Sequence, residues 1–233
     1  MRFERGMKQT MFDTLLSLPL FQGLGRRDLT RILESTRLDF ATARAGSTIL
    51  RQDTPCTGLT FIMQGQVATT TYAADRRWSV EEEMKVPAVV GIDVLYGSTR
   101  THRLDCQART SVRYLLMDKR TVAALTAYFE VFRLNVLNLL TTTAVRREQL
   151  LWMPPQTTLE GRIAAFMRAH VHHPAGGKRF RIALHLLGDY LGEDPRYVSK
   201  ALHRMAEAGL LRLQRKTIEV DSFETLINYN FNP

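Results

Sequence analysis

The order of hydrophobic and polar residues divides the chain into three stretches. From Arg44 to Met117, short β-prone runs alternate with turns, many of them containing glycine, a pattern that is typical of a β-sandwich or a small barrel. The predicted strands are Ser47–Leu50, Leu59–Met63, Gln66–Tyr72, Trp78–Val86 and Ser111–Leu116. Two short helices are expected before them, over Met11–Leu16 and Arg26–Ser35, because apolar residues recur there at helical spacing.

The second stretch, Thr121–Leu151, contains neither Gly nor Pro. Its apolar residues recur in steps of three and four, at Val122, Leu125, Phe129, Phe132, Val136, Leu140 and Ala144. A single helix of about 30 residues would be ~45 Å long, too long to bury this stripe against one small barrel. We therefore predict that two copies of the helix pair, as in a coiled coil. The predicted dimer interface comprises Phe129, Phe132, Val136, Leu140 and Ala144. The alternative is two helices that are broken near Phe129–Glu130.

The third stretch starts after Pro154-Pro155, a pair that cannot continue a helix. A helix is predicted over residues 159–171, with Thr157 or Thr158 as its N-cap. A second helix is predicted over Leu184–Leu191.

A turn and a further helix follow. Gly192 ends the helix Leu184–Leu191, because glycine tolerates a left-handed backbone. Asp194 is the predicted N-cap of the next helix, with Pro195 at its first position, and Gly209 closes that helix. A β-hairpin with a basic turn is predicted between residues 210 and 220. Helix, turn, helix and basic hairpin are the parts of a winged helix-turn-helix.

The exposed side of this last helix has the chemistry of a DNA-contacting surface. Arg196 can donate two hydrogen bonds to a guanine edge, and nearby cations can bind phosphates. Between Lys178 and Lys216 there are nine Lys or Arg against four Asp or Glu, an excess that favours DNA binding. The predicted DNA-binding residues are Arg196, Tyr197, Ser199, Lys200, His203, Arg204, Arg215 and Lys216. The alternative is a surface helix whose charges are only solvated.

Composition narrows the class of protein. The 233 residues are 45% hydrophobic and 24% charged, values that are typical of a folded protein rather than a disordered chain. The net charge of +9 favours a polyanionic partner, nucleic acid first and an anionic membrane surface second. No apolar run approaches the roughly 20 residues of a transmembrane helix, and residues 1–8 lack the apolar core of a signal peptide. We therefore expect a cytoplasmic protein that does not bind a membrane.

Four regions, in this order along the chain, resemble the Crp/Fnr superfamily of bacterial transcription regulators, the catabolite-activator type. These regions are Leu18–Gly25 with Asp28-Leu29, Ala45–Asp53 with Leu59–Val67, Leu159–Phe166, and Leu187–Ile218. The resemblance implies an α+β fold with an N-terminal β-roll barrel of the cyclic-nucleotide-binding kind (residues 1–120), a long dimerisation helix (121–153) and a C-terminal winged helix-turn-helix (154–233). It also implies a homodimer that binds a palindromic site in double-stranded DNA, with RNA polymerase as a further partner.

The sequence departs from that family where its members bind the cyclic nucleotide. The family's Gly-Glu pair is Gly91-Ile92 here, so the carboxylate that would bind the ribose is missing. The arginine that would neutralise the phosphate is displaced by one position in His102-Arg103, and a shift of one residue on a strand turns the side chain to the other face. We therefore expect no response to cyclic AMP. Arg103 still leaves an anionic ligand possible.

Two further departures concern the helices. The family's adenine-contacting residues fall at about Arg147-Glu148, and its leading Arg-Glu pair in the recognition helix is Pro195-Arg196. The preferred DNA sequence should therefore differ from that of the nucleotide-binding relatives.

The sensed signal is left open by the sequence. Some relatives of this family sense redox state or gases through haem or an iron–sulfur cluster, and two cysteines are too few for a cluster. The residues considered for a ligand or haem are Met63, His102, Arg103 and Cys106. The structural alternative is that Met63 and Cys106 are core residues, where such side chains usually lie. Three alternatives follow: an unidentified ligand, haem, or a constitutive DNA-binding dimer with an empty barrel.

No catalytic or metal site is predicted. The sequence contains neither a Gly-x-Ser-x-Gly elbow nor a Walker loop, so an enzyme is disfavoured. His170, His172 and His173 are close in sequence, but they are expected in a solvated loop because a metal site needs further well-placed ligands. Within Glu81–Glu83, a strand-like run, two of the three carboxylates are expected to face solvent.

Overall fold

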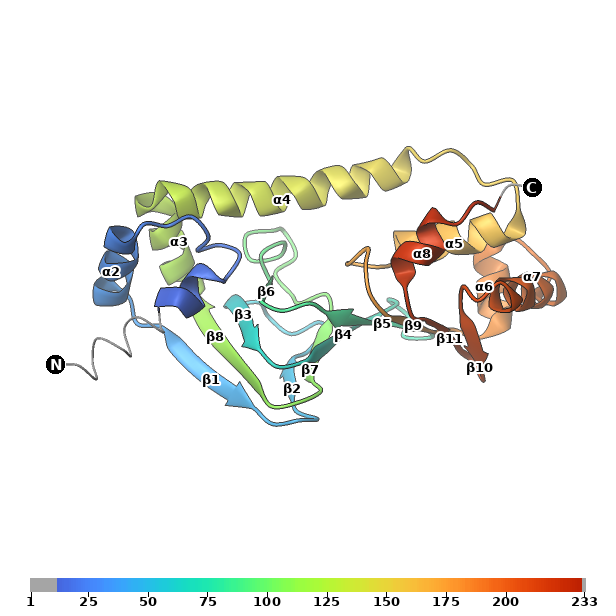
Figure 1. Cartoon of the computed structure of the whole chain (residues 1–233), viewed down its shortest axis with the longest axis horizontal. Helices are drawn as coiled ribbons and strands as arrows, with labels where there is room; N and C mark the ends of the chain where they lie inside the picture. The colour runs from blue at the N-terminus through green and yellow to red at the C-terminus, as the bar shows by residue number, and fades with distance from the viewer. Residues whose placement is uncertain (1–11, 232–233) are drawn as a thin grey trace. The chain divides into compact units, whose positions relative to one another are not determined.

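The structure, a computed structural model, describes residues 12–231 and divides into two compact units (Figure 1). The first unit comprises the residues up to Val67 together with Lys85–Arg147, and the second comprises Ala68–Met84 together with the residues from Glu148 onward. This grouping differs from the three consecutive segments expected from the sequence, because a strand of the segment 68–84 pairs with the C-terminal part of the chain. The N-terminal segment in which no signal peptide is expected, residues 1–8, lies outside the described residues, as does Met11.

Antiparallel strands form the core of the first unit. One sheet has the order β1-β8-β3-β6, and β2 pairs with β7. The strands are β1 (Asp39–Ala43), β2 (Thr48–Leu50), β3 (Gly58–Gln64), β6 (Ala88–Val90), β7 (Asp105–Ala108) and β8 (Val112–Asp118). The predicted strands at β2, β3 and β8 are confirmed, whereas β1, β6 and β7 were not predicted. β1 is mostly exposed, β6 is a run of three apolar residues, and β7 alternates polar and apolar residues over only four positions, which is too short a pattern to predict a strand.

Two helical segments precede the strands, as predicted. Residues 12–16 are helical, and α2 spans Arg26–Ser35. Leu29 and Ile32 form the buried side of α2.

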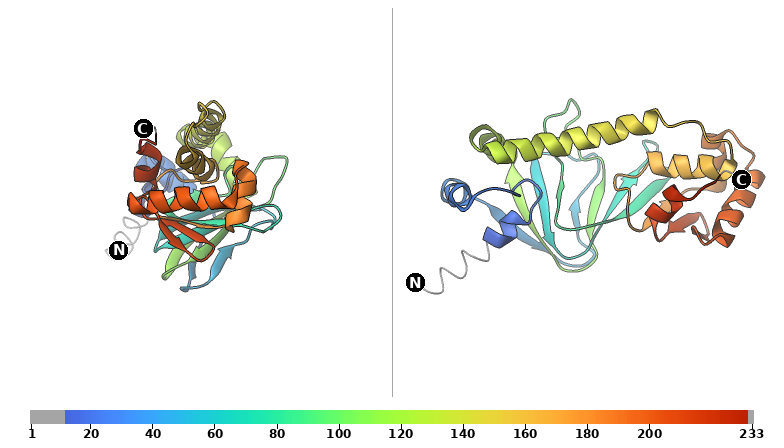
Figure 2. Two further views of the ribbon diagram at one scale, coloured as in Figure 1. Left: turned by 90° about the vertical axis from the view of Figure 1, so that its right-hand side faces the viewer. Right: turned by 45° about the horizontal axis from the view of Figure 1, so that its top comes forward.

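The prediction of one long helix is wrong, and the alternative of two helices is correct. α3 (Lys119–Tyr128) and α4 (Glu130–Leu151) are bent by 114° where they meet. Phe129 between them has an extended backbone (φ −118°, ψ 106°). α4 itself continues without another break, and Figure 2 shows it in green to yellow. Among the helices of residues 12–231, none alone is long and apolar enough to cross a membrane, and α3 and α4 pass that test only together, as a bent pair.

The apolar stripe of α4 belongs to the core of the first unit. Phe132 is fully buried, and its ring lies 5.4 Å from that of Phe21, centroid to centroid. Phe129 and Val136 are buried in the same cluster, and Leu140 packs against it. The predicted dimer interface is therefore corrected: the break turns α4 back onto its own unit, and the stripe is used there. Of the predicted residues only Ala144 is exposed.

The second unit combines one sheet with four helices. Its strands follow the order β10-β11-β9-β5, all antiparallel, with β4 on the other side of β5. The strands are β4 (Val67–Tyr72), β5 (Ser79–Met84), β9 (Lys178–Arg181), β10 (Arg212–Gln214) and β11 (Thr217–Val220), and the helices are α5 (Leu159–Ala169), α6 (Leu184–Leu191), α7 (Pro195–Glu207) and α8 (Phe223–Asn228). The predicted strands at β4, β5 and β11 and the helices α5, α6 and α7 are confirmed, whereas β9 and α8 were not predicted. Thr158 is the N-cap of α5.

A buried tryptophan attaches β5 to the helices of this unit. Trp78 is 7% exposed and packs against Phe166 of α5, with ring centroids 5.4 Å apart. Its Nε1–H donates a hydrogen bond of 3.0 Å to the hydroxyl of Tyr190 in α6. His170 belongs to the same aromatic cluster, and its ring centroid lies 4.9 Å from that of Trp78 in a T-shaped arrangement.

A buried carboxylate attaches β5 to the strand β9. Glu82 accepts hydrogen bonds from the backbone N–H groups of His172 (2.8 Å) and His173 (2.9 Å), and its Oε2 lies 3.5 Å from Nζ of Lys178. Both charged side chains are essentially inaccessible. Glu83 is exposed, and Glu81 is half-buried in ion pairs. The histidine loop is thus organised around Glu82, and within residues 12–231 no group of three or more His, Cys, Asp or Glu side chains is arranged to hold a metal ion.

The role of the α4 stripe is tested by substituting one buried and one exposed residue of the same helix. Phe132→Ala is expected to lower the free energy of unfolding by ~3–5 kcal/mol, because it leaves a cavity in a packed core. Val145→Ala, at a position of the same helix that is 50% exposed, is expected to change it by less than about 1 kcal/mol. Urea unfolding of both variants at low protein concentration checks this, and equal losses would contradict the placement of Phe132.

Candidate nucleic-acid interface

The turn between α6 and α7 is fixed by a left-handed glycine and by close backbone contacts. Gly192 ends α6 with a left-handed backbone (φ 64°), and the N–H of Glu193 donates to the carbonyl of Gly188 at 3.0 Å. A Cβ atom at Gly188 would lie only 2.7 Å from the carbonyl oxygen of Glu193. The close approach therefore requires glycine in the middle of α6, a constraint that the sequence analysis did not identify.

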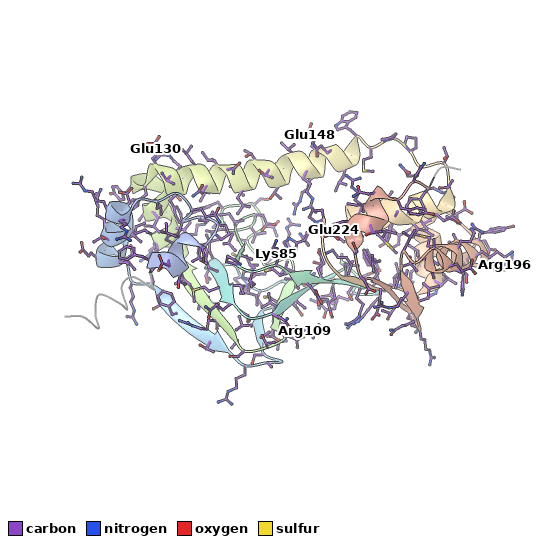
Figure 3. All side chains as sticks on the ribbon, viewed as in Figure 1. Lys85, Arg109, Glu130, Glu148, Arg196 and Glu224 are labelled. Atoms are coloured by element: carbon purple, nitrogen blue, oxygen red, sulfur yellow. The ribbon has the colours of Figure 1, made fainter. Side chains whose placement is uncertain are left out.

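Asp194 caps α7 and also holds Arg196. Its carboxylate accepts from the backbone N–H of Arg196 at 2.8 Å, from Nε at 3.1 Å and from Nη2 at 2.9 Å. These bonds from the side chain and backbone of Arg196 lower the pKa of Asp194 to about 2. The guanidinium side chain is 85% exposed, and Figure 3 shows Arg196 pointing away from the second unit. Donation to a base through the same two nitrogens would require this exposed pair to open, which costs little in water.

α7 has one buried and one exposed side, as its spacing predicts. Val198, Ala201, Leu202 and Met205 are buried in the core of the unit. On the other side Tyr197 is 58% exposed, Lys200 is exposed and Ser199 is half-buried.

The C-terminal half of α7 is engaged with its own unit. Nδ1 of His203 lies 2.7 Å from the carbonyl oxygen of Ser199. Arg204 donates from Nε to Glu160 of α5 at 2.5 Å. Arg204 therefore points towards α5, and of the predicted residues on α7 the structure brings Arg196, Tyr197 and Lys200 together on the exposed N-terminal half.

The hairpin β10–β11 supplies the remaining predicted cations. Arg215 and Lys216 form its turn, both exposed, with Lys216 at φ 58°. Ile218 anchors the hairpin in the core. Within the described part of the chain, Lys200, Arg215 and Lys216 form no ion pair, so their charges are available to a polyanion.

A ladder of alternating charges crosses the sheet away from that turn. Glu81, Arg179, Glu219 and Arg212 face one another on adjacent strands, and Arg212 also pairs with Asp221. Arg179 donates to Glu219 at 2.8 Å and to Glu81 at 3.1 Å. Several of the cations that make this region basic in sequence are therefore neutralised locally, and the positive charge is concentrated on α7 and at the hairpin turn.

Of the four residues considered for a ligand in the first unit, three are buried and one is exposed. Met63 is 7% exposed and packs in the core, and Cys106 is inaccessible, which raises the pKa of its thiol to about 12. His102 is 6% exposed, and burial lowers the pKa of its imidazole, although Asp93 partly offsets that effect. Arg103 is exposed. An open hollow of about 610 Å³ in this unit has none of these residues in its lining, which consists of Thr57, Tyr96, Asp118, Lys119, Arg120 and Ala123.

An internal ion pair links α4 to the segment that begins with Gly91-Ile92. Nη2 of Arg147 lies 3.6 Å from Oδ2 of Asp93, with both side chains partly exposed. Ile92 is half-buried and packs against the core of the unit.

No protein-family model and no curated protein sequence matches this chain. Solved structures do match. The catabolite activator protein of Thermus thermophilus is 19% identical, over 90% of this chain and 98% of that one, with a TM-score of 0.46. A transcriptional regulator described as of the Crp/Fnr family, from Eubacterium rectale, is 18% identical over 91% and 99% of the two chains, with a TM-score of 0.49. The sensor domain of the regulator DNR from Pseudomonas aeruginosa is 18% identical over 68% of this chain and 100% of that domain, with a TM-score of 0.48.

The chain is thus similar to solved regulators of the Crp/Fnr type. The sequence motifs resemble the same superfamily. Because the identities are below 25% and the TM-scores below 0.5, the site is argued from the chain's own residues.

The close approach at Gly188 gives a stability test of the helix-turn-helix. Alanine normally stabilises a helix interior by up to about 1 kcal/mol over glycine, but at Gly188 its Cβ would overlap the carbonyl of Glu193. Gly188→Ala is therefore expected to lower the free energy of unfolding, by ~1–3 kcal/mol. Gly177→Ala is the control, because the nearest atoms to a Cβ there are 3.7 Å away. A Gly188→Ala variant as stable as wild type in thermal unfolding would contradict this geometry.

Proposed function

We propose that this chain is a sequence-specific DNA-binding transcription regulator and has no catalytic role. The observation that carries the proposal is the exposed N-terminal half of α7, with Arg196, Tyr197 and Lys200, together with an exposed hairpin turn made of Arg215 and Lys216 in the same unit. A helix of this kind enters the major groove, where its N-terminal residues contact base edges, while the hairpin cations bind backbone phosphates.

The proposed regulator is a homodimer that pairs through the outer face of α4. Leu134 and Leu137 are 54% and 51% exposed, and Thr141 and Ala144 continue the same row in steps of four and three residues. This heptad-like spacing is that of a coiled-coil seam, and two exposed leucines in one row favour a second copy as the occupant. A two-fold dimer would present two recognition helices to a palindromic DNA site.

We also propose that the regulator does not respond to cyclic AMP. Ile92 supplies no carboxylate for a ribose hydroxyl, and Arg147, where the resemblance places an adenine contact, pairs instead with Asp93. The signal is left unassigned. Haem sensing is the alternative, and the geometry does not favour it, because Met63, His102 and Cys106 are all buried and none of them lines the open hollow of their unit. A regulator of this kind would act in the cytoplasm, together with RNA polymerase.

Two alanine variants separate base recognition from phosphate binding. Arg196→Ala is expected to weaken specific binding by ~1–3 kcal/mol and to relax base preference at one position of each half-site. Lys216→Ala is expected to weaken binding to all sequences alike and to reduce the slope of log K against log salt by about 0.9. Selection of binding sites from a random duplex pool, followed by titrations at several salt concentrations, measures both effects.

A wild-type protein that selects no sequence would contradict the proposed function itself. Unchanged base preference in Arg196→Ala would remove that residue from the recognition surface, and a sequence-selective loss in Lys216→Ala would contradict a phosphate contact.

The proposed dimer seam is tested by placing a charge on it. Leu137→Asp is expected to convert the dimer to a monomer in sedimentation equilibrium, because a carboxylate would be buried in an apolar seam. Tyr128→Asp is the control, since Tyr128 is 80% exposed on α3 and lies outside the seam. Dimers that survive Leu137→Asp, or that are lost equally in both variants, would contradict this seam.

A further inference from the structure

Two hairpin turns lie at the same end of the strands in the sheet of the second unit. Thr217, the first residue of β11 after the turn, pairs with Arg181 at the end of β9, and Arg181 pairs in turn with Ser79 at the start of β5. The turn of the hairpin β4–β5, residues 73–78, therefore lies at the same end of the strands as the β10–β11 turn. Figure 1 shows β5, β9, β11 and β10 one after another across this sheet.

Cations from three separate parts of the chain lie at this end of the sheet. They are Arg76 and Arg77 from the β4–β5 turn, Arg181 from β9, and Arg215 and Lys216 from the β10–β11 turn. Asp75 pairs with Arg77, and Glu81 pairs with Arg181. The three parts of the chain contribute five cations to this end of the sheet, so positive charge predominates there.

The two arginines of the β4–β5 turn are exposed. Arg76 has φ 55°, and its guanidinium lies 5.3 Å from the ring centroid of Tyr72. Arg77 makes only a loose pair with Asp75, with Nε and Oδ2 3.9 Å apart and both side chains about half-exposed.

The turn is also held firmly in place. Trp78, which directly follows Arg77, is buried between α5 and α6 and bonded to Tyr190. Further along β5, Glu82 is locked to β9 by Lys178. A segment fixed in this way loses little conformational entropy when it binds, which favours a preformed contact surface.

We propose that the β4–β5 turn is a second wing, whose Arg76 and Arg77 bind phosphates of the same DNA that the β10–β11 turn contacts. This inference rests on the proposed function. β5 and β11 are separated only by β9, so with strands about 4.8 Å apart the facing ends of the two turns lie ~10 Å from each other and their centres ~14 Å. Successive phosphates of one strand rise by about 3.4 Å along the duplex, so both turns can reach the same stretch of backbone. Contacts to phosphate alone add affinity without sequence preference.

The test is the salt dependence of binding by the full chain to a mixed-sequence duplex. A double variant, Arg76→Asn with Arg77→Gln, removes both charges, and asparagine tolerates the left-handed backbone at position 76. The slope of log K against log salt is expected to become shallower by about 1.8, because each phosphate contact contributes about 0.9. Base preference is expected to stay unchanged.

The matched control is Arg26→Asn with Arg27→Gln, which removes the same two charges from an exposed pair at the start of α2. Its slope is expected to equal that of wild type. An equal change in both double variants would overturn the proposal, because the effect would then be one of net charge. An unchanged slope in the turn variant would also overturn it. If that variant then bound phosphatidylserine vesicles more weakly than wild type, the cations of the turn would be assigned to a membrane surface.

A third variant separates this inference from the proposed function. Arg215→Gln with Lys216→Gln removes the two charges of the other turn. Wild-type binding that depends on Arg215 and Lys216 but not on Arg76 and Arg77 contradicts the second wing alone. Wild-type protein that does not bind the duplex contradicts both proposals.

Discussion

The carboxylate of Glu82 fixes a strand from the first half of the chain in the sheet of the second unit. A charge that is fully buried is tolerated only when it is paired and hydrogen-bonded, and Glu82 meets this requirement with Lys178 and two backbone N–H groups of the loop after α5. Removing one partner of such a pair leaves an uncompensated charge in the interior. The position of β5, the course of the histidine loop and the start of β9 all depend on this one group.

The way in which charges are paired also determines which surface is left for DNA. Arg179 and Arg212 are held in the ladder across the sheet, Arg204 is held by Glu160, and Lys178 is buried. Between Lys178 and Lys216, the cations with no ion pair are Lys200 on α7 and Arg215 and Lys216 at the hairpin turn, while Arg196 is paired only at the surface, with Asp194. A basic stretch of sequence is thus sorted by folding into structural cations and cations that face outward.

Local features of the chain were predictable, and long-range ones were not. Gly192, Asp194 and Pro195 determine the turn and the start of α7 through their own backbone preferences, so the helix-turn-helix followed from the sequence. The strand β9 did not, because its four residues are stabilised by β5, which lies almost a hundred residues earlier.

The stripe on α4 shows a second limit of sequence patterns. Steps of three and four residues establish that a face is buried, but they do not say what covers it. Phe132 meets Phe21 of the same chain, while Leu134 and Leu137, which belong to a row with the same steps, are exposed. For the same reason the sequence could list candidate cations but could not identify those that Glu160, Glu219 and Asp221 neutralise.

The second unit is discontinuous along the chain, and this has a practical consequence for anyone who cuts or recombines the protein. A fragment that begins at Glu148 would lack β5, the indole of Trp78 and the counter-ion of Lys178, and would expose the edge of β9. A chimaera that exchanges only the C-terminal part with a relative would join a sheet to a foreign hairpin. The transferable module is the C-terminal part together with residues 68–84.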